Sequence, residues 1–277
     1  MTSVIICADD FAQSAAIDDA IIDLIQRGVL TATSCMTLSP AWAESATQLT
    51  PEIRAKADIG LHLDFTQFSQ SLRLSHPLLV LRSLFGLLDQ QAIRINIQHQ
   101  FNAFEQATGT APDYVDGHLH VHQLPMIRNA LLAEMQQRYG KLPSFERPWL
   151  RISSPPAGSG FKARIIHWLG ANALQTAALQ AGFKVSPCLL GVYDFNGDAA
   201  AYQAHWVTWA SQLKQCPAPT KNRLPPVLMC HPAKPSDQID DSDPIAKARM
   251  IEWQVMQSTD FSNWLLKADI RLVKGSH

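Results

Sequence analysis

The sequence lacks the marks of a protein that binds nucleic acid or crosses a membrane. Its 277 residues carry a formal net charge of −1, and the chain contains no run of basic residues. Nucleic acid and anionic membranes attract concentrated positive charge, so neither is expected as the main partner. The uninterrupted apolar segments all fall short of the roughly 20 residues that span a bilayer. We therefore expect no membrane span.

Cysteine is scarce and unevenly spaced. The five cysteines are odd in number, and none forms a CxxC pair: Cys7, Cys35, Cys188, Cys216 and Cys230. The first apolar segment, Val4–Cys7, is too short for the core of a signal peptide and is typical of a buried strand. Together these features predict reduced thiols rather than a disulfide framework, and a cytoplasmic location.

The composition and the order of elements favour one α/β domain over residues 1–277. Hydrophobic residues make up 47% of the chain and charged residues 17%, so a large core is available. Apolar strand-like runs alternate with helical patterns about seven times, without an internal repeat or a long linker. We expect a deformed, TIM-like (β/α) barrel, which commonly fills about 200–250 residues as one unit. A doubly wound open sheet is the structural alternative.

The segment near 67–110 is longer than a minimal connection between a strand and a helix. Ile93, Ile97, Phe101 and Phe104 mark one face of a helix, and the leucine-rich stretch Leu78–Leu88 precedes it. We interpret this segment as a helical insertion. It could overhang the mouth of the barrel, form an interface in a homodimer, or be an ordinary crossover helix with an extra turn or two.

Polar residues follow several apolar strands at the point where each strand ends. They are Asp9 and Asp10, His62, His118, Arg151 and His231. In a parallel barrel the carboxyl ends of the strands meet at one mouth, where active sites lie. The sequence therefore predicts that these side chains form one site.

Asp116–His122 carries three imidazoles at every second position. If the preceding strand continued, His118, His120 and His122 would point to one face. Same-face residues lie about 6–7 Å apart, whereas metal–nitrogen bonds are about 2.0–2.1 Å. We expect one of the three to bind a metal ion directly, or two at most. The others would support the ligands or contact the substrate.

Five motifs resemble those of the YdjC-like carbohydrate deacetylases, which include chito-oligosaccharide deacetylases and members associated with hopanoid biosynthesis. The matching segments run in the family's order from residue 4 to about residue 255: Ala8–Phe11, Gly28–Ser34, Gly60–Leu63, Asp116–His122 and Leu228–Pro232. Each motif alone is weak, but five in register are specific.

The resemblance implies a deformed (β/α) barrel and assigns roles to individual residues. Asp10, His62 and His118 fall on the family's metal ligands. Asp9 falls on its catalytic base, and His231 falls on the histidine of its His-Pro motif. The chain departs from the family pattern at three positions: Ala12 replaces a glycine, Gly117 a serine and Leu119 a histidine. No departure removes an implied ligand.

The implied reaction removes the acetyl group from N-acetylated sugars such as chito-oligosaccharides or related glycans and glycolipids. One carboxylate and two imidazoles leave coordination positions open for chemistry on one divalent ion, Mg²⁺ or Zn²⁺. The ion would polarise the acetamide carbonyl and activate a water, with Asp9 as the base. His231 would protonate the departing amine. Arg151 could pair with Asp9 or orient the sugar.

Two other functions remain open. A phosphoesterase could use a similar set of ligands, although no cluster of Lys, Arg or glycine-rich anion loops is evident. A carbohydrate-binding or sensing protein could keep the fold without catalysis, but it would not need Asp9 beside the ligands.

Several other polar residues are expected to lie outside the site. We interpret Arg249 and Glu252 as a surface ion pair on one helix. His76, His99, His167 and His205 lack partner spacing, and Asp240 with Asp241 is expected in a solvated loop. One long helix is expected over Phe161–Ala181.

Overall fold

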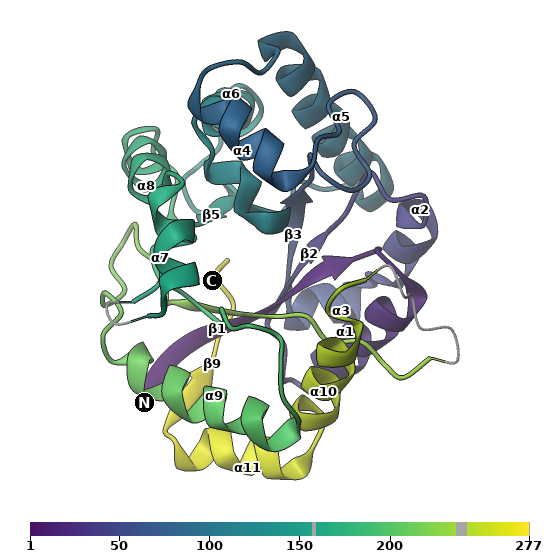
Figure 1. Cartoon of the computed structure of the whole chain (residues 1–277), viewed down its shortest axis with the longest axis vertical. Coiled ribbons are helices and arrows are strands. Elements are labelled where there is room, and N and C mark those ends of the chain that lie inside the picture. The colour runs from purple at the N-terminus through teal and green to yellow at the C-terminus, as the bar shows by residue number, and fades with distance from the viewer. Residues whose placement is uncertain (157–158, 237–242, 277) are drawn as a thin grey trace.

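A computed structural model of the chain describes residues 1–156, 159–236 and 243–276 (Figure 1). Its sheet is parallel throughout, and the strands follow the order β6-β5-β4-β3-β2-β1-β8-β7, with β9 paired to the first residues of β1. The strands are β1 Thr2–Phe11, β2 Ala32–Cys35, β3 Asp58–Leu63, β4 Tyr114–Gly117, β5 Trp149–Arg151, β6 Val185–Ser186, β7 Leu189–Leu190, β8 Val227–Cys230 and β9 Ile270–Leu272.

The eight-stranded path is a nearly closed barrel. Its two end strands, β6 and β7, follow each other directly in the chain. Helices surround the strands on all sides of the view in Figure 1. The predicted deformed (β/α) barrel is therefore confirmed, and the open-sheet alternative is wrong.

The helices connect successive strands. They are α1 Ala15–Gln26, α2 Trp42–Ser45, α3 Pro51–Lys56, α4 His76–Leu84, α5 Gln90–Thr108, α6 Pro125–Tyr139, α7 Phe161–Trp168, α8 Ala171–Gln180, α9 Ala199–Leu213, α10 Ala246–Met256 and α11 Thr259–Lys267, with 3₁₀ turns η1 Ala46–Gln48 and η2 His118–Gln123. In Figure 1, α4, α5 and α6 lie above the strands and α9 and α11 lie below them, on opposite sides of the barrel.

Strand β1 is an inner strand of the sheet. It pairs with β2 on one side and with β8 on the other, and its residues from Val4 to Ala8 are fully or almost fully buried. A strand covered on both faces needs apolar side chains in both directions, which explains why this run does not alternate with polar residues. Asp9 and Asp10 follow this buried run, and their carboxylates lie at the barrel mouth.

The predicted insertion between β3 and β4 contains α4 and α5. The buried carboxylate of Asp64, just after β3, accepts backbone hydrogen bonds from residues 66–69, and Gln100 of α5 bonds to the Asp64 backbone. This network fixes the loop that leads to α4. Helix α4 and the turn after it expose Leu81, Leu84 and Phe85, and a homodimer interface on this surface stays a prediction.

The local elements differ from the expectations in places. The helix expected over Phe161–Ala181 is divided into α7 and α8 at Gly170, whose φ is 127° and whose added Cβ would lie 2.2 Å from the carbonyl oxygen of Gln123. Helices α3 and α11 and the two-residue strand β7 were not predicted, because short elements carry little periodic signal. The Asp240–Asp241 pair lies outside the described residues.

The expectation of five reduced thiols is wrong. Cys188, just before β7, and Cys216, after α9, form a disulfide with a Cα–Cα distance of 5.9 Å. The other three cysteines are free and buried. Because 28 residues separate the bonded pair, only the packing of α9 against the barrel brings the two sulfurs together. Sequence spacing alone does not show this.

Within the described ranges, no helix has both the length and the apolar character to cross a membrane.

Thiol titration tests the disulfide directly. Unfolded protein without reductant should show three reactive thiols, those of Cys7, Cys35 and Cys230, and reductant should raise the count to all five cysteines. As a control, Cys216→Ser should show four thiols without reductant, because Cys188 loses its partner. A count of five before reduction of the wild-type protein would contradict the bond.

Candidate active site

A cavity of about 650 Å³ opens at the carboxyl ends of the strands. This volume falls within the range of about 300–1,000 Å³ typical of small-molecule sites. The site residues predicted from the sequence that line the cavity are Asp9, Asp10, His62, His118, His120 and His231. His122 and Arg151 lie behind this wall and are fully buried. The structure thus brings the predicted strand-end residues together.

Asp10, His62 and His118 form the centre of the cavity wall. Oδ1 of Asp10 lies 3.4 Å from Nε2 of His62 and 3.1 Å from Nδ1 of His118. Two ligands about 2.0–2.2 Å from a tetrahedral ion are about 3.3–3.6 Å apart, so these separations suit a metal site. One ligand atom from each residue lies within 4.8 Å of the others. The carboxylate and imidazole donors therefore fit a divalent ion.

The backbone at the end of β1 directs the two neighbouring carboxylates apart. Asp10 has a φ of 71° and Ala12 a φ of 74°, and the pairing with β2 is irregular between Ala8 and Phe11. Residues other than glycine rarely adopt this left-handed conformation, which costs about 1–2 kcal/mol. The strain at Asp10 is of the kind found at functional sites. Ala12 has the same left-handed conformation, which glycine adopts without strain.

Asp9 is held by Arg151. The guanidinium donates to both carboxylate oxygens, with Nη1–Oδ1 at 2.6 Å and Nη2–Oδ2 at 2.8 Å, and its Nη1 lies 3.0 Å from Asp116 Oδ2. Burial would raise the pKa of Asp9, but Arg151 outweighs it and holds the pKa well below its usual value. Cys7, Asp9 and Asp116 could geometrically hold an ion. However, Arg151 already supplies the positive charge there.

Arg249 is part of the site, which corrects the expectation of a surface pair with Glu252. Its side chain is 3% exposed; Nη2 donates to Oδ2 of Asp10 at 2.7 Å, and Nε donates to Asp243 at 2.6 Å. Burial would raise the pKa of Asp10, but Arg249 holds it well below the usual value, with help from the hydrogen bonds of His118 and His62. Helical spacing indicates that Arg249 and Glu252 share a face of α10. It does not show that this face points to the barrel mouth.

Glu252 is likewise fully buried and bonds elsewhere. Its carboxylate accepts the Tyr193 hydroxyl at 2.6 Å and the His231 backbone N–H at 2.5 Å. Burial raises the pKa of Glu252 to about 7. Sequence reasoning missed this residue because its partners come from two distant segments. Glu252 fixes the backbone that carries His231.

His231 faces the carboxylate of Asp9 from the end of β8. Its Nε2 lies 4.0 Å from Oδ2 of Asp9, and its ring packs edge-on against Phe195 at 5.2 Å. Burial lowers the pKa of His231 to about 4 despite the nearby aspartates. The imidazole is therefore neutral at pH 7 in the resting protein.

The histidine cluster does not continue the strand, so the expected common face is wrong. Strand β4 ends at Gly117, and Leu119 and His120 adopt left-handed conformations with φ of 51° and 61°. Only His118 reaches Asp10. His120 contacts Ser153 at 2.9 Å and lines the cavity, whereas His122 Nε2 donates to the carbonyl of Arg151 at 2.8 Å. Of the three histidines, His118 is the one that lies with Asp10 and His62, and the expectation that one or two of them bind a metal ion stays a prediction.

His62 is oriented from behind by a carboxylate. Its Nδ1 lies 2.6 Å from Oδ1 of Asp116, and Nε2 faces Asp10. Burial would lower the pKa of His62, but Asp116 and Asp9 raise it to about 10. An ion at Nε2 would take the place of the proton. The carboxylate behind the ring is the arrangement that commonly orients metal-binding histidines.

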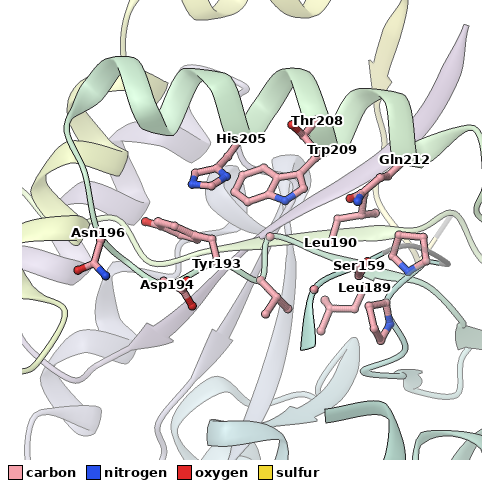
Figure 2. Close-up of a pocket in the computed structure, with 15 residues that line it drawn as sticks. Ser159, Leu189, Leu190, Tyr193, Asp194, Asn196, His205, Thr208, Trp209 and Gln212 are labelled. Atoms are coloured by element: carbon pink, nitrogen blue, oxygen red, sulfur yellow. The ribbon is translucent and has the colours of Figure 1, made fainter. Parts of the chain in front are cut away.

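The remaining histidines were expected on the surface or in helix packing. His99 is exposed and His167 bonds to Ser154. His76 instead lines the active-site cavity, where it was not expected, and His205 lines a second cavity beside α9 (Figure 2). No spacing in the sequence distinguishes His76 from the others, because α4 reaches the cavity only through the long loop after β3.

Comparison with known proteins identifies similar chains. The family model described as YdjC-like protein matches residues 3–267. A carbohydrate deacetylase of Xenopus laevis is 23% identical over 306 residues, covering 97% of this chain and 96% of that protein. A chitooligosaccharide deacetylase of Yersinia pestis bv. Antiqua (strain Angola) is 31% identical over 134 residues, covering 45% and 52%.

A solved structure from Enterococcus faecalis V583, named there as a candidate cellobiose-phosphate cleavage protein, shares the fold. It superposes with a TM-score of 0.67 at 18% sequence identity, covering 99% of this chain and 97% of that one. At this identity, the likeness supports the architecture and says nothing of the reaction.

Replacing Arg249 tests its place in the site. Arg249→Met should lower the free energy of unfolding by about 3–5 kcal/mol, because it leaves the largely buried carboxylates of Asp10 and Asp243 without the guanidinium that both contact. The measurement is urea unfolding in the presence of a chelator, so that no metal ion offsets the charge. Arg27→Met is the matched control: Arg27 is 48% exposed and pairs with Asp23 on α1, so its loss should cost less than about 1 kcal/mol. Equal losses for the two variants would contradict the assignment.

Proposed function

The chain belongs to the YdjC-like protein family, a family with carbohydrate deacetylases among its members, and we propose that it is a metal-dependent N-deacetylase of acetylated sugars. The proposal gives it a substrate containing N-acetylglucosamine and one divalent ion. One observation carries it: Asp9, held by Arg151, lies beside the Asp10, His62 and His118 cluster in one cavity. A protein that only binds sugar has no use for this additional buried carboxylate.

Asp10, His62 and His118 would hold the ion. Two imidazoles favour Zn²⁺ or another transition metal, and the open, oxygen-containing site would also accept Mg²⁺. When bound, the ion supplies a Lewis acid that polarises the acetamide carbonyl and favours ionisation of water. Arg249 and Asp116 contact Asp10 and His62 from behind and keep these donors in place.

Asp9 acts as the general base in this proposal. Its low pKa keeps the carboxylate ionised at neutral pH, and the two-point contact with Arg151 fixes the orientation of both oxygens. Because Asp10 turns away in the left-handed conformation, Asp9 is left to accept a proton from water at the attacked carbonyl. Arg151 is fully buried, so it acts on Asp9 and does not touch the sugar.

His231 moves the proton to the departing amine. The neutral imidazole must first gain the proton that it donates, and among the described residues the carboxyl nearest to its Nε2 atom is that of Asp9, at 4.0 Å. A proton passed from Asp9 to His231 Nε2 and then to nitrogen completes cleavage of the C–N bond. The low pKa makes the imidazolium a strong acid, which suits a donor to a basic leaving group. His120, on the cavity wall, would contact the sugar.

The phosphoesterase alternative has less support from the cavity. Two arginines line the cavity. Arg249 is already paired with Asp10 and Asp243, and Arg73 is exposed to solvent. A phosphoryl group needs several converging cations or backbone N–H donors. Acetate release from N-acetylglucosamine oligomers, with and without a chelator, distinguishes a deacetylase from a phosphoesterase and from a protein that only binds sugar. We propose a cytoplasmic location from the short first apolar segment of the sequence; the Cys188–Cys216 bond removes reduced thiols as a reason for it.

Metal content tests the ligand set. Purified Asp10→Asn and His118→Ala proteins should contain far less divalent metal than the wild type, because each variant removes one of three donor groups. His120→Ala should keep most of the metal, since His120 bonds to Ser153 rather than to Asp10. His99→Ala, at an exposed position, is the control. Undiminished metal in Asp10→Asn, or a loss in His120→Ala as complete as that in His118→Ala, would defeat the assignment.

Acetate release tests the base. Asp9→Asn should keep its metal and lose roughly 10²–10⁴-fold in turnover, the usual contribution of a general base. His231→Ala should also hold metal but release acetate slowly. Both variants are compared at equal metal loading, so that a loss of the ion is not mistaken for a loss of chemistry. Near wild-type turnover of Asp9→Asn would remove this residue from the mechanism, and normal turnover of His231→Ala would leave the amine without its proposed donor.

A further inference from the structure

The turn at the end of β1 contains two left-handed residues other than glycine. They are Asp10 and Ala12, whose φ values are 71° and 74°. Such conformations are strained, and they persist only where the surrounding structure holds them in place. Contacts from outside the turn must therefore keep the Asp10 carboxylate directed toward His62 and His118.

A third carboxylate supplies one of these contacts. Asp18, in the first turn of α1, accepts a hydrogen bond from the backbone N–H of Ala12, with Oδ1 2.6 Å from the nitrogen. Its other oxygen, Oδ2, accepts the hydroxyl of Ser45 on α2 at 2.5 Å. Asp18 therefore joins α1, α2 and the end of β1 at one buried point.

The backbone carbonyl of Ala12 is held as well. It accepts the hydroxyl of Ser39 at 2.5 Å, so both backbone polar groups of Ala12 have a partner. The backbone N–H of Gln13 closes the turn on the carbonyl of Asp10 at 3.0 Å. Neither Asp18 nor Ser39 is among the residues that line the active-site cavity. Their contacts therefore reach Asp10 through the backbone.

Burying Asp18 is costly. The residue is 1% exposed. Asp9 and Asp10 each pair with an arginine, whereas the hydrogen-bond partners of Asp18 are a backbone N–H and a hydroxyl. Burial accordingly raises the pKa of Asp18 to about 6. An apolar residue would fill the same space without this desolvation cost. What the carboxylate adds is an acceptor for each of the two donors.

The held residue is close to the candidate ligand, because Ala12 follows Asp10 by two positions. If Ala12 relaxed to an ordinary backbone conformation, the turn would relax with it and move the Asp10 carboxylate. Oδ1 of Asp10 lies 3.4 Å from Nε2 of His62 and 3.1 Å from Nδ1 of His118. Metal–ligand distances hold to within about 0.2 Å, so a larger shift of this oxygen would weaken metal binding.

We propose that Asp18 is a positioning residue for the metal ligand Asp10, which it directs by fixing the left-handed turn at the end of β1. This inference rests on the ligand set of the proposed function and adds to it a side chain that touches neither the ion nor the substrate. Asp18 acts on the backbone conformation, whereas Arg249 acts on the charge of the Asp10 carboxylate. Removing a group that supports a metal ligand usually costs about 10–100-fold in metal affinity or activity.

Metal affinity tests this role. Each protein is stripped of metal, and its affinity for Zn²⁺ is measured by competition with a chelating indicator. Asp18→Ala should bind Zn²⁺ about 10–100-fold more weakly than the wild type. Asp18→Asn should stay close to the wild type, because its amide oxygen still accepts the Ala12 N–H and the Ser45 hydroxyl can turn to accept from the NH₂ group. Asp19→Ala, at the exposed neighbouring position on α1, is the matched control and should bind as the wild type does.

Two further measurements separate positioning from a general loss of structure. Urea unfolding with a chelator gives the stability of each variant without metal; a merely structural role would lower stability and leave the Zn²⁺ affinity of the folded protein unchanged. Co²⁺ bound in place of Zn²⁺ reports the ligand geometry through its visible absorption, which should change in Asp18→Ala and not in Asp18→Asn. If Asp18→Ala fails to fold, Ser39→Ala removes the donor to the Ala12 carbonyl and should weaken Zn²⁺ binding several-fold. Ser211→Ala, exposed on α9, should not.

The outcomes distinguish this role from the proposed function. Wild-type affinity in Asp18→Ala, a loss in Asp18→Asn as large as in Asp18→Ala, or equal affinities of Ser39→Ala and Ser211→Ala would overturn the positioning role and leave the ligand set standing. A wild-type protein that binds neither Zn²⁺ nor Co²⁺ would refute both. Weakened Zn²⁺ binding in Asp18→Ala, with no acetate released by the wild type, would support the positioning role and refute deacetylation.

Discussion

The structure depends on two neighbouring buried carboxylates, each neutralised by its own arginine. Asp9 pairs with Arg151 from β5, and Asp10 pairs with Arg249 from α10. Two adjacent anions in a buried site repel each other, and each would lose much of its hydration without a partner. The barrel resolves this conflict by bringing one guanidinium from each side. The positions of β5 and α10 are therefore tied to the end of β1.

The same arrangement separates two chemical roles that one sequence motif places side by side. The left-handed backbone at Asp10 turns its carboxylate toward His62 and His118, while Asp9 faces Arg151 and His231. Both carboxylates have lowered pKa values, each through its own arginine. In the proposed reaction, Asp10 can therefore bind the ion while Asp9 accepts a proton, and the two do not compete for one partner.

The sequence predicts the parts of the fold and site that follow from local pattern. Buried apolar runs identified most of the strands, and polar residues at their ends identified the residues that converge on the cavity. It could not show that Arg249 and Glu252 are buried, because helical spacing gives their shared face but not what covers it. It also gave the wrong conformation for the histidine cluster, since nothing in an alternating pattern reveals the left-handed turn at Leu119 and His120. The Cys188–Cys216 bond was missed because it depends on where α9 packs.

Glu252 shows why such tertiary contacts matter for function. Burying this carboxylate is costly, and burial raises its pKa to about 7. A glutamine could accept the His231 N–H with its oxygen, but its NH₂ group would then face the Tyr193 hydroxyl, which would have to turn from donating to accepting. An ionised carboxylate offers an acceptor to each of the two donors as they are arranged here. One side chain, Glu252, therefore holds both the loop that separates the two cavities and the backbone that carries His231. A shift of either segment would displace the other.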